Sequence, residues 1–140
     1  MNPWGALRDQ GELTLVFAAM ADAGRYYQHH RAIVLADDLT QAQRRCTLAH
    51  ELVHAERGDI SCCSDWHANK QERRVDQLAA RRLIGLDQLI DALLWGDDER
   101  ELAEVLWVDV ETVRARLSGL TEVEKQIIEE RLWAAERLLP

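Results

Sequence analysis

Two short runs rich in apolar and β-branched residues indicate strands in the N-terminal part of the chain. The first run, Glu12–Phe17, follows Gly11, and the second is Arg31–Leu35. A polar stretch containing Gly24 separates them. Runs of this length and composition, bounded by glycine and polar residues, are typical of strands. We therefore expect two strands that form a hairpin or part of a small sheet.

The hydrophobic period changes to that of a helix after the second run. The sequence Thr-Gln-Ala-Gln starting at Thr40 has the T-x-x-Q form of a capping box, so we expect a helix from Gln41 to about Arg57, ended by Gly58. Residues 59–70 contain turn formers and indicate a loop, and a second helix is expected from about Asn69 to Leu83. One stripe of the first helix, at helical spacing, consists of Cys46, Ala49, His50, Val53 and His54.

Beyond Gly85 the pattern is helical throughout, with expected helices over residues 86–95, 99–106, 110–117 and 121–139. The fold class predicted is therefore α+β: a small β-sheet or hairpin packed against two helices, followed by an all-helical C-terminal extension. Residues 1–85 form the expected core, and residues 86–140 form the extension that packs on it. A chain of 140 residues fits this arrangement.

Charge is distributed unevenly along the chain. Residues 1–85 contain 11 Lys and Arg against 11 Asp and Glu, whereas residues 86–140 contain 6 against 14, so the net charge of −8 arises in the C-terminal part. Proteins bind duplex DNA mainly by neutralising its phosphates, and an acidic segment repels them. The charge pattern therefore disfavours nucleic-acid binding.

Several features together predict a cytoplasmic protein. No apolar run approaches the roughly 20 residues needed to cross a bilayer, so we expect no membrane span. The first ten residues lack an apolar segment after a basic start, which argues against secretion. Three cysteines, an odd number, do not form a disulfide framework.

Residues 50–54 read His-Glu-Leu-Val-His, the HExxH pattern, inside the first expected helix. Residues four apart on a helix lie one turn above each other, so His50 and His54 can bind one ion. Zn²⁺ suits imidazole ligands, and Glu51 is placed to accept a proton from a zinc-bound water. The pattern predicts a hydrolytic zinc site, although a five-residue motif also occurs by chance on solvated helices.

The third metal ligand is expected on the second helix. Glu72 and Asp76 have E-x-x-x-D spacing, so one carboxylate can bind the metal while the other orients a liganding histidine. Residues 69–72 also read N-x-x-E, which would merely cap the helix; if Glu72 binds metal, the helix must start earlier, near Ser64. His67 is the alternative third ligand, because zinc sites with three histidines exist.

A hydrolytic site of this kind also needs a donor near the substrate carbonyl. The polar aromatic cluster before the second strand contains four candidates, Tyr26, Tyr27, His29 and His30. The same cluster could instead form the tip of a hairpin.

The two motifs together resemble the ImmA/IrrE family of metallo-endopeptidases. Residues 46–54 read CTLAHELVH and residues 72–84 read ERRVDQLAARRLI, close to the family pattern T-L-A-H-E-x-x-H followed by E-x-x-A-[DN]-x-F-A-A-x-L-L. The resemblance covers about residues 30–120. Val75 and Leu78 depart from the family's Ala and Phe at packing positions, which suggests a divergent branch such as one carried by phages or prophages.

The resemblance implies a small gluzincin-like fold and an activity. By position, His50, His54 and Glu72 would bind zinc, Glu51 would be the base, and Asp76 would support a ligand. The family is associated with cleavage of helix-turn-helix repressors during mobile-element induction or stress, so the implied partner is a repressor protein. The expected function is therefore a zinc-dependent endopeptidase.

Two alternatives come from other functional classes. Residues 101–117 resemble a helix-turn-helix, which would make the chain a DNA-binding regulator, but only Arg114 and Arg116 on its second helix could contact DNA. The chain could also bind a repressor without cutting it. An activity assay separates this second alternative from the enzyme.

Overall fold

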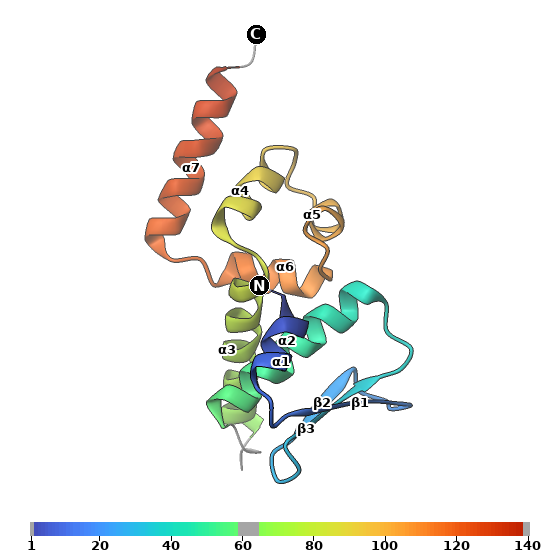
Figure 1. Ribbon diagram of the computed structural model, residues 1–140. Coiled ribbons are helices and arrows are strands. Elements are labelled where there is room, and N and C mark those ends of the chain that lie inside the picture. The colour runs from blue at the N-terminus through green and yellow to red at the C-terminus, as the bar shows by residue number, and fades with distance from the viewer. Residues whose placement is uncertain (1, 59–64, 139–140) are drawn as a thin grey trace.

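The computed structural model describes residues 2–58 and 65–138, with the backbone alone for residues 65–68. Within these residues the chain forms seven helices and three strands (Figure 1), so the expected α+β class is confirmed. None of the helices described is both long and apolar enough to cross a membrane. The elements are α1 Pro3–Asp9, β1 Thr14–Ala18, β2 Gly24–Tyr27, β3 Ala32–Ala36, α2 Gln41–Arg57, α3 Asp65–Leu83, α4 Leu86–Leu93, α5 Glu99–Leu106, α6 Val110–Ser118 and α7 Glu122–Arg137.

The sheet has the strand order β1-β3-β2, so of the two expected arrangements, a hairpin or part of a small sheet, the second is confirmed. The two strands predicted from the sequence both exist, but as β1 and β3 they pair in parallel, with Thr14 opposite Ala32. The hairpin is formed instead by β2 and β3, which are antiparallel. The extra strand β2 comes from the polar stretch around Gly24. Its side chains lack a clear apolar run, so its strand conformation depends on pairing with β3.

Helix α2 begins and ends where the sequence predicts. Thr40 accepts a hydrogen bond from the Gln43 amide, and the Gln43 side chain accepts one from the Thr40 amide, which completes the capping box. At the other end Gly58 has φ of 66°, a left-handed conformation that glycine adopts without strain. These local interactions define the helix that carries the HExxH pattern.

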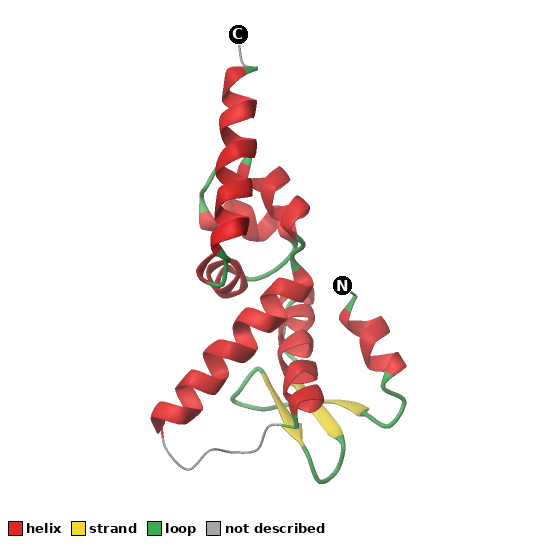
Figure 2. Cartoon of the chain, turned by 90° about the vertical axis from the view of Figure 1, so that its left-hand side faces the viewer, coloured by secondary structure: helices red, strands yellow, loops and turns green. Residues whose placement is uncertain are grey.

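Helix α3 starts at Asp65, earlier than the predicted start at Asn69, so residues 65–70 are not a loop. Residues 59–64 of the expected loop lie outside the described residues. Because the helix already includes Asn69, the N-x-x-E pattern does not form a cap. Helix α3 packs against α2 (Figure 2), and Glu72 is therefore available to face α2.

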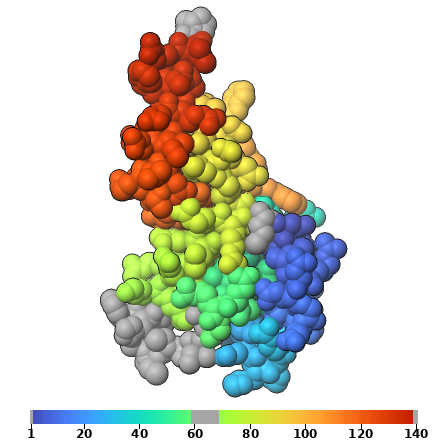
Figure 3. Space-filling model, turned by 60° about the vertical axis from the view of Figure 1, so that its left-hand side comes forward, coloured from blue at the N-terminus to red at the C-terminus, as the bar shows by residue number. Residues whose placement is uncertain are grey.

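Helix α2 lies between two apolar clusters. On one side, Leu48 and Leu52 pack with Ile33 and Leu35 of β3. On the other side, residues of α2 join a larger cluster that extends through α3, α4, α5 and α6 to Ile128 of α7. Both faces of α2 are thus held in place, which gives the HExxH helix a rigid position. The molecule is elongated, with the sheet at one end and α7 at the other (Figure 3).

An ion-pair network centred on the buried Arg116 joins α3, α6 and α7. The Arg116 side chain is 2 % exposed; its Nε donates to the Ile84 carbonyl at 2.8 Å and its Nη2 lies 3.1 Å from Glu124 Oε2. The Arg81 guanidinium also donates to Glu124, at 2.6 Å for the shorter contact, and lowers the pKa of this carboxyl well below its usual value. Glu124 therefore balances two cations.

We expect Glu124→Ala to lower the free energy of unfolding by about 3 kcal/mol, because removing one partner leaves the charge of Arg116 buried without compensation. The measurement is chemical denaturation followed by circular dichroism. Glu122→Ala is the control, because Glu122 lies in the same first turn of α7 but is exposed. Equal losses in the two variants would contradict the structural role given to the network.

Candidate metal centre

Two histidines of α2 converge at the surface that faces α3. His50 and His54 lie one helical turn apart, with ring centroids separated by 4.9 Å. Their Nε2 atoms are 3.2 Å apart, so both imidazoles direct the same nitrogen to one point. The i, i+4 spacing of the sequence pattern places both imidazoles on one face of α2.

Glu72 of α3 completes the cluster. Its Oε2 lies 2.9 Å from His50 Nε2, and its Oε1 lies 2.9 Å from His54 Nε2. One ligand atom from each of the three residues lies within 4.8 Å of the others. Two imidazole nitrogens and one carboxylate oxygen match the donor set of a catalytic zinc site, which leaves a coordination position for water or substrate. The residues therefore fit a metal ion.

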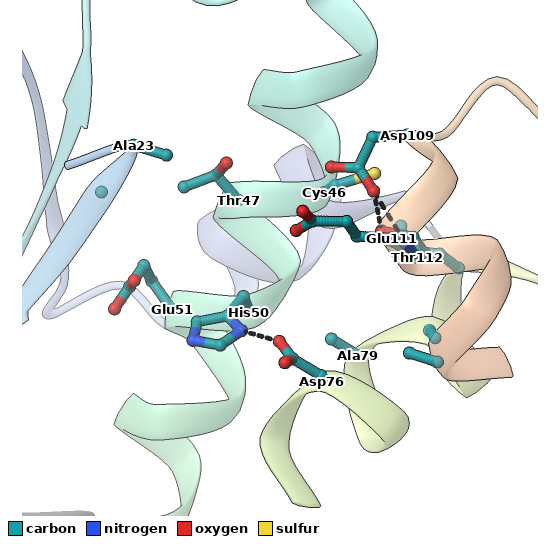
Figure 4. Close-up of a pocket in the computed structure, with 14 residues that line it drawn as sticks. Ala23, Cys46, Thr47, His50, Glu51, Asp76, Ala79, Asp109, Glu111 and Thr112 are labelled. Carbon is teal, nitrogen blue, oxygen red and sulfur yellow. Dashed lines mark hydrogen bonds and ion pairs between the residues drawn. The ribbon is translucent and has the colours of Figure 1, made fainter. Parts of the chain in front are cut away.

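Asp76 orients the first histidine from the opposite side of the ring. Its Oδ1 accepts a hydrogen bond of 2.7 Å from His50 Nδ1 (Figure 4). A proton held on Nδ1 leaves the lone pair of Nε2 free for a metal. Asp76 lies one turn after Glu72 on α3, so the E-x-x-x-D spacing brings both carboxylates to the same imidazole.

The electrostatics of the cluster favour positive charge at its centre. Burial disfavours protonation of His50, but the hydrogen bonds with Asp76 and Glu72 outweigh it and raise the pKa of His50 to about 10. Burial likewise opposes protonation of His54, and Glu72 raises its pKa. The two histidines in turn lower the pKa of Glu72 far below its usual value. A metal ion would supply the positive charge in place of these protons.

Glu51 lies beside the cluster without belonging to the ligand set. It is 6 % exposed, and this burial raises the pKa of its carboxyl. Figure 4 shows it on the side of His50 that faces β2, opposite Asp76. A buried carboxylate with a raised pKa next to a metal position is suited to accept and return a proton.

A cavity of about 280 Å³ opens at His50 and Glu51 and runs between β2, α2, α3 and α6. Gly24 lets β2 approach α2 closely, because a Cβ at this position would lie 2.6 Å from Thr47 Cγ2 and 3.2 Å from the Val34 carbonyl oxygen. The residues that line the cavity are Ala23, Gly24, Cys46, Thr47, His50, Glu51, Asp76, Ala79, Ala80, Leu83, Asp109, Glu111, Thr112 and Ala115.

The structure brings together all five residues singled out by the sequence, namely His50, Glu51, His54, Glu72 and Asp76. The side chain of His67, the alternative ligand, lies outside the described residues. None of the four candidate carbonyl donors lines the cavity, and the Tyr26 hydroxyl accepts a hydrogen bond from Arg31 at 3.0 Å. Tyr26 and Tyr27 belong to β2, and His29 and His30 lie in the turn that joins β2 to β3.

Sequence reasoning missed the contribution of α6 to the cavity. Asp109, Glu111 and Thr112 lie about sixty positions from the HExxH pattern, and no local motif relates them to it. Asp109 also caps α6, because its Oδ1 accepts a hydrogen bond of 2.8 Å from the Thr112 amide.

The site has the arrangement of an HExxH metallopeptidase. Two histidines come from one helix, a glutamate comes from a second helix, and a buried glutamate lies beside them. The family is established by comparison with known proteins. The chain belongs to peptidase family M78, described as the IrrE N-terminal-like domain, whose model matches residues 12–118.

One curated protein illustrates the relationship. The chain is 34% identical over 104 residues to the radiation response metalloprotease IrrE of Deinococcus deserti. The matched region is 66% of this chain and 37% of that protein, so the chain corresponds to little more than a third of its relative. No solved structure matches the chain.

Proposed function

We propose that the protein is a zinc-dependent endopeptidase. The observation that carries this proposal is the cluster of His50, His54 and Glu72 beside the buried Glu51, at the opening of a cavity. Zinc is favoured because it is borderline-soft, redox-inert and commonly bound by two histidines and one glutamate in hydrolases. Membership of a metallopeptidase family supports the same reaction.

Each residue of the site has its own role in the proposed peptide hydrolysis. His50, His54 and Glu72 would hold the zinc, which when bound acidifies a water and polarises the substrate carbonyl. Glu51 takes a proton from the attacking water and passes it to the leaving amine nitrogen, a role for which its raised pKa suits it. Asp76 keeps the Nδ1 proton on His50, so the orientation of this imidazole is preserved throughout.

Strand β2 suggests how a substrate would lie in the site. It is an edge strand that pairs with β3 alone in the described sheet, and Ala23 and Gly24 at its start line the cavity. An extended peptide can add to such an edge through main-chain hydrogen bonds. The proposal is therefore of a substrate segment in extended conformation between β2 and the HExxH helix.

The proposed substrate is a helix-turn-helix repressor in the cytoplasm, cleaved during stress or mobile-element induction. The relative's name, a radiation response metalloprotease, agrees with a stress role. The acidic C-terminal helices would attract the basic DNA-binding face of a repressor. Direct DNA binding is disfavoured, because Arg114 pairs with Glu99 at 2.9 Å and Arg116 is buried.

The test is to incubate the zinc-loaded protein with a repressor encoded by a neighbouring gene and with an unfolded polypeptide. We expect fragments detectable by mass spectrometry, which disappear with a chelator and return when zinc is restored. Binding of the repressor without cleavage under zinc would favour a non-catalytic regulator instead. Salt-dependent binding of duplex DNA would favour the DNA-binding alternative.

A further inference from the structure

The cavity beside the metal cluster has the size and wall composition of a pocket for one side chain. Its volume of about 280 Å³ is below the roughly 300–1,000 Å³ of typical small-molecule sites. Ala79 and Ala80 of α3 and Ala115 of α6 contribute small apolar side chains to its walls. A long unbranched side chain can lie along such walls without displacing a polar group.

The end of the cavity away from Glu51 is acidic. Figure 4 shows Glu111 on α6, with its carboxylate directed toward Cys46 and Thr47 of α2. Asp109 lies next to it, and its Oδ1 accepts hydrogen bonds from the Thr112 amide and hydroxyl at 2.8 and 2.6 Å. No lysine or arginine is among the residues that line the cavity, and Arg114, the cation of α6 that interacts with Glu111, is paired with Glu99 at 2.9 Å.

Glu111 is an exposed carboxylate in the first turn of α6 that lines the cavity. Asp76 is bonded to His50, Asp109 caps α6, and Glu51 lies beside the metal cluster. Within the described part of the chain Glu111 makes no hydrogen bond and no salt bridge. Within the described residues, the group of three side chains that could hold a metal ion is His50, His54 and Glu72. The acidic end of the cavity is therefore not a second site of this three-ligand type.

We propose that this cavity selects a lysine or arginine side chain of the substrate next to the bond that is cut, with Glu111 as the specificity-determining residue. The proposal rests on the proposed peptidase function and specifies its substrate. The aliphatic stem would lie along the alanines, and the cationic head would reach the Glu111 carboxylate, where a charge-assisted hydrogen bond is stronger than a neutral one. A peptide that lies along β2 and passes Glu51 would present a side chain to the cavity opening.

The first experiment is to profile cleavage of a proteome-derived peptide library by the zinc-loaded protein, with products sequenced by mass spectrometry. We expect lysine and arginine to be enriched about tenfold at one position flanking the cut bond, a preference typical of a charged pocket. In Glu111→Lys this enrichment should disappear, and aspartate and glutamate should be favoured at that position. Glu101→Lys is the matched control, because Glu101 lies in the first turn of α5, is exposed and does not line the cavity.

The second experiment measures binding of n-butylguanidinium, an arginine side-chain mimic, by NMR and needs no catalysis. We expect Glu111→Gln to weaken this binding by at least about threefold, the scale of one exposed ion pair, and Glu101→Gln to leave it unchanged. Cleavage of the library without a basic preference would overturn the pocket assignment but not the peptidase. If no peptide of the library were cleaved, the proposed peptidase function would be refuted. The guanidinium measurement would then test the pocket by itself, and equal binding to the wild type and to Glu111→Gln would refute the role of Glu111.

Discussion

A Glu51→Gln variant is expected to retain zinc and to lose peptide hydrolysis by about 10³-fold, the scale of a general base that is removed from a hydrolytic site. The amide has nearly the shape of the carboxylate, but it cannot accept a proton from the attacking water. Glu51 is not a member of the ligand cluster, so the metal should remain bound. The measurement pairs the zinc content of the purified variant with its kcat/KM on a peptide that the wild type cleaves.

The variant should also be folded, because the uncharged amide is easier to bury than a carboxylate at this 6 % exposed position. Thermal unfolding of the zinc-loaded proteins checks this point. Glu56→Gln is the control on the same helix, because Glu56 is exposed and does not line the cavity. A hydrolysis rate near that of the wild type for Glu51→Gln would remove Glu51 from the role of base.

A Glu72→Ala variant is expected to bind zinc at least about 10²-fold more weakly, since even loss of a supporting residue costs 10- to 100-fold and Glu72 is the proposed third ligand. Its two oxygens each lie 2.9 Å from a histidine nitrogen of the cluster. Hydrolysis should fall in parallel with metal occupancy. Titration with zinc against a competing chelator measures the affinity.

Two further variants separate Glu72 from the other candidates. Glu56→Ala removes an exposed carboxylate of α2 and should leave zinc affinity unchanged. His67→Ala tests the alternative ligand expected from the sequence. If zinc affinity were lost in His67→Ala and kept in Glu72→Ala, the ligand set proposed for the metal would be wrong.

The sequence by itself determined the features that depend on contacts within one helical turn. The capping boxes at Thr40 and Thr121 define the starts of α2 and α7, because their hydrogen bonds link residues three apart. The HExxH spacing brings His50 and His54 together for the same reason, and the E-x-x-x-D spacing brings Glu72 and Asp76 to one face. These interactions do not depend on the rest of the fold, so they could be predicted from the sequence.

Tertiary structure decided how these local units meet. The contact between His50 and Asp76 joins residues 26 positions apart and requires that α3 start at Asp65 and pack against α2. Because β3 pairs with β1 on one side and with β2 on the other, β2 is an edge strand. The polar stretch that contains β2 has no alternation of apolar and polar residues that would have predicted this strand. Likewise, α6 contributes Glu111 to the cavity only because α6 packs against α3. Such contacts between distant residues are stabilised by burial of apolar surface, which is non-directional, so the sequence pattern predicts that burial occurs but not which elements it brings together.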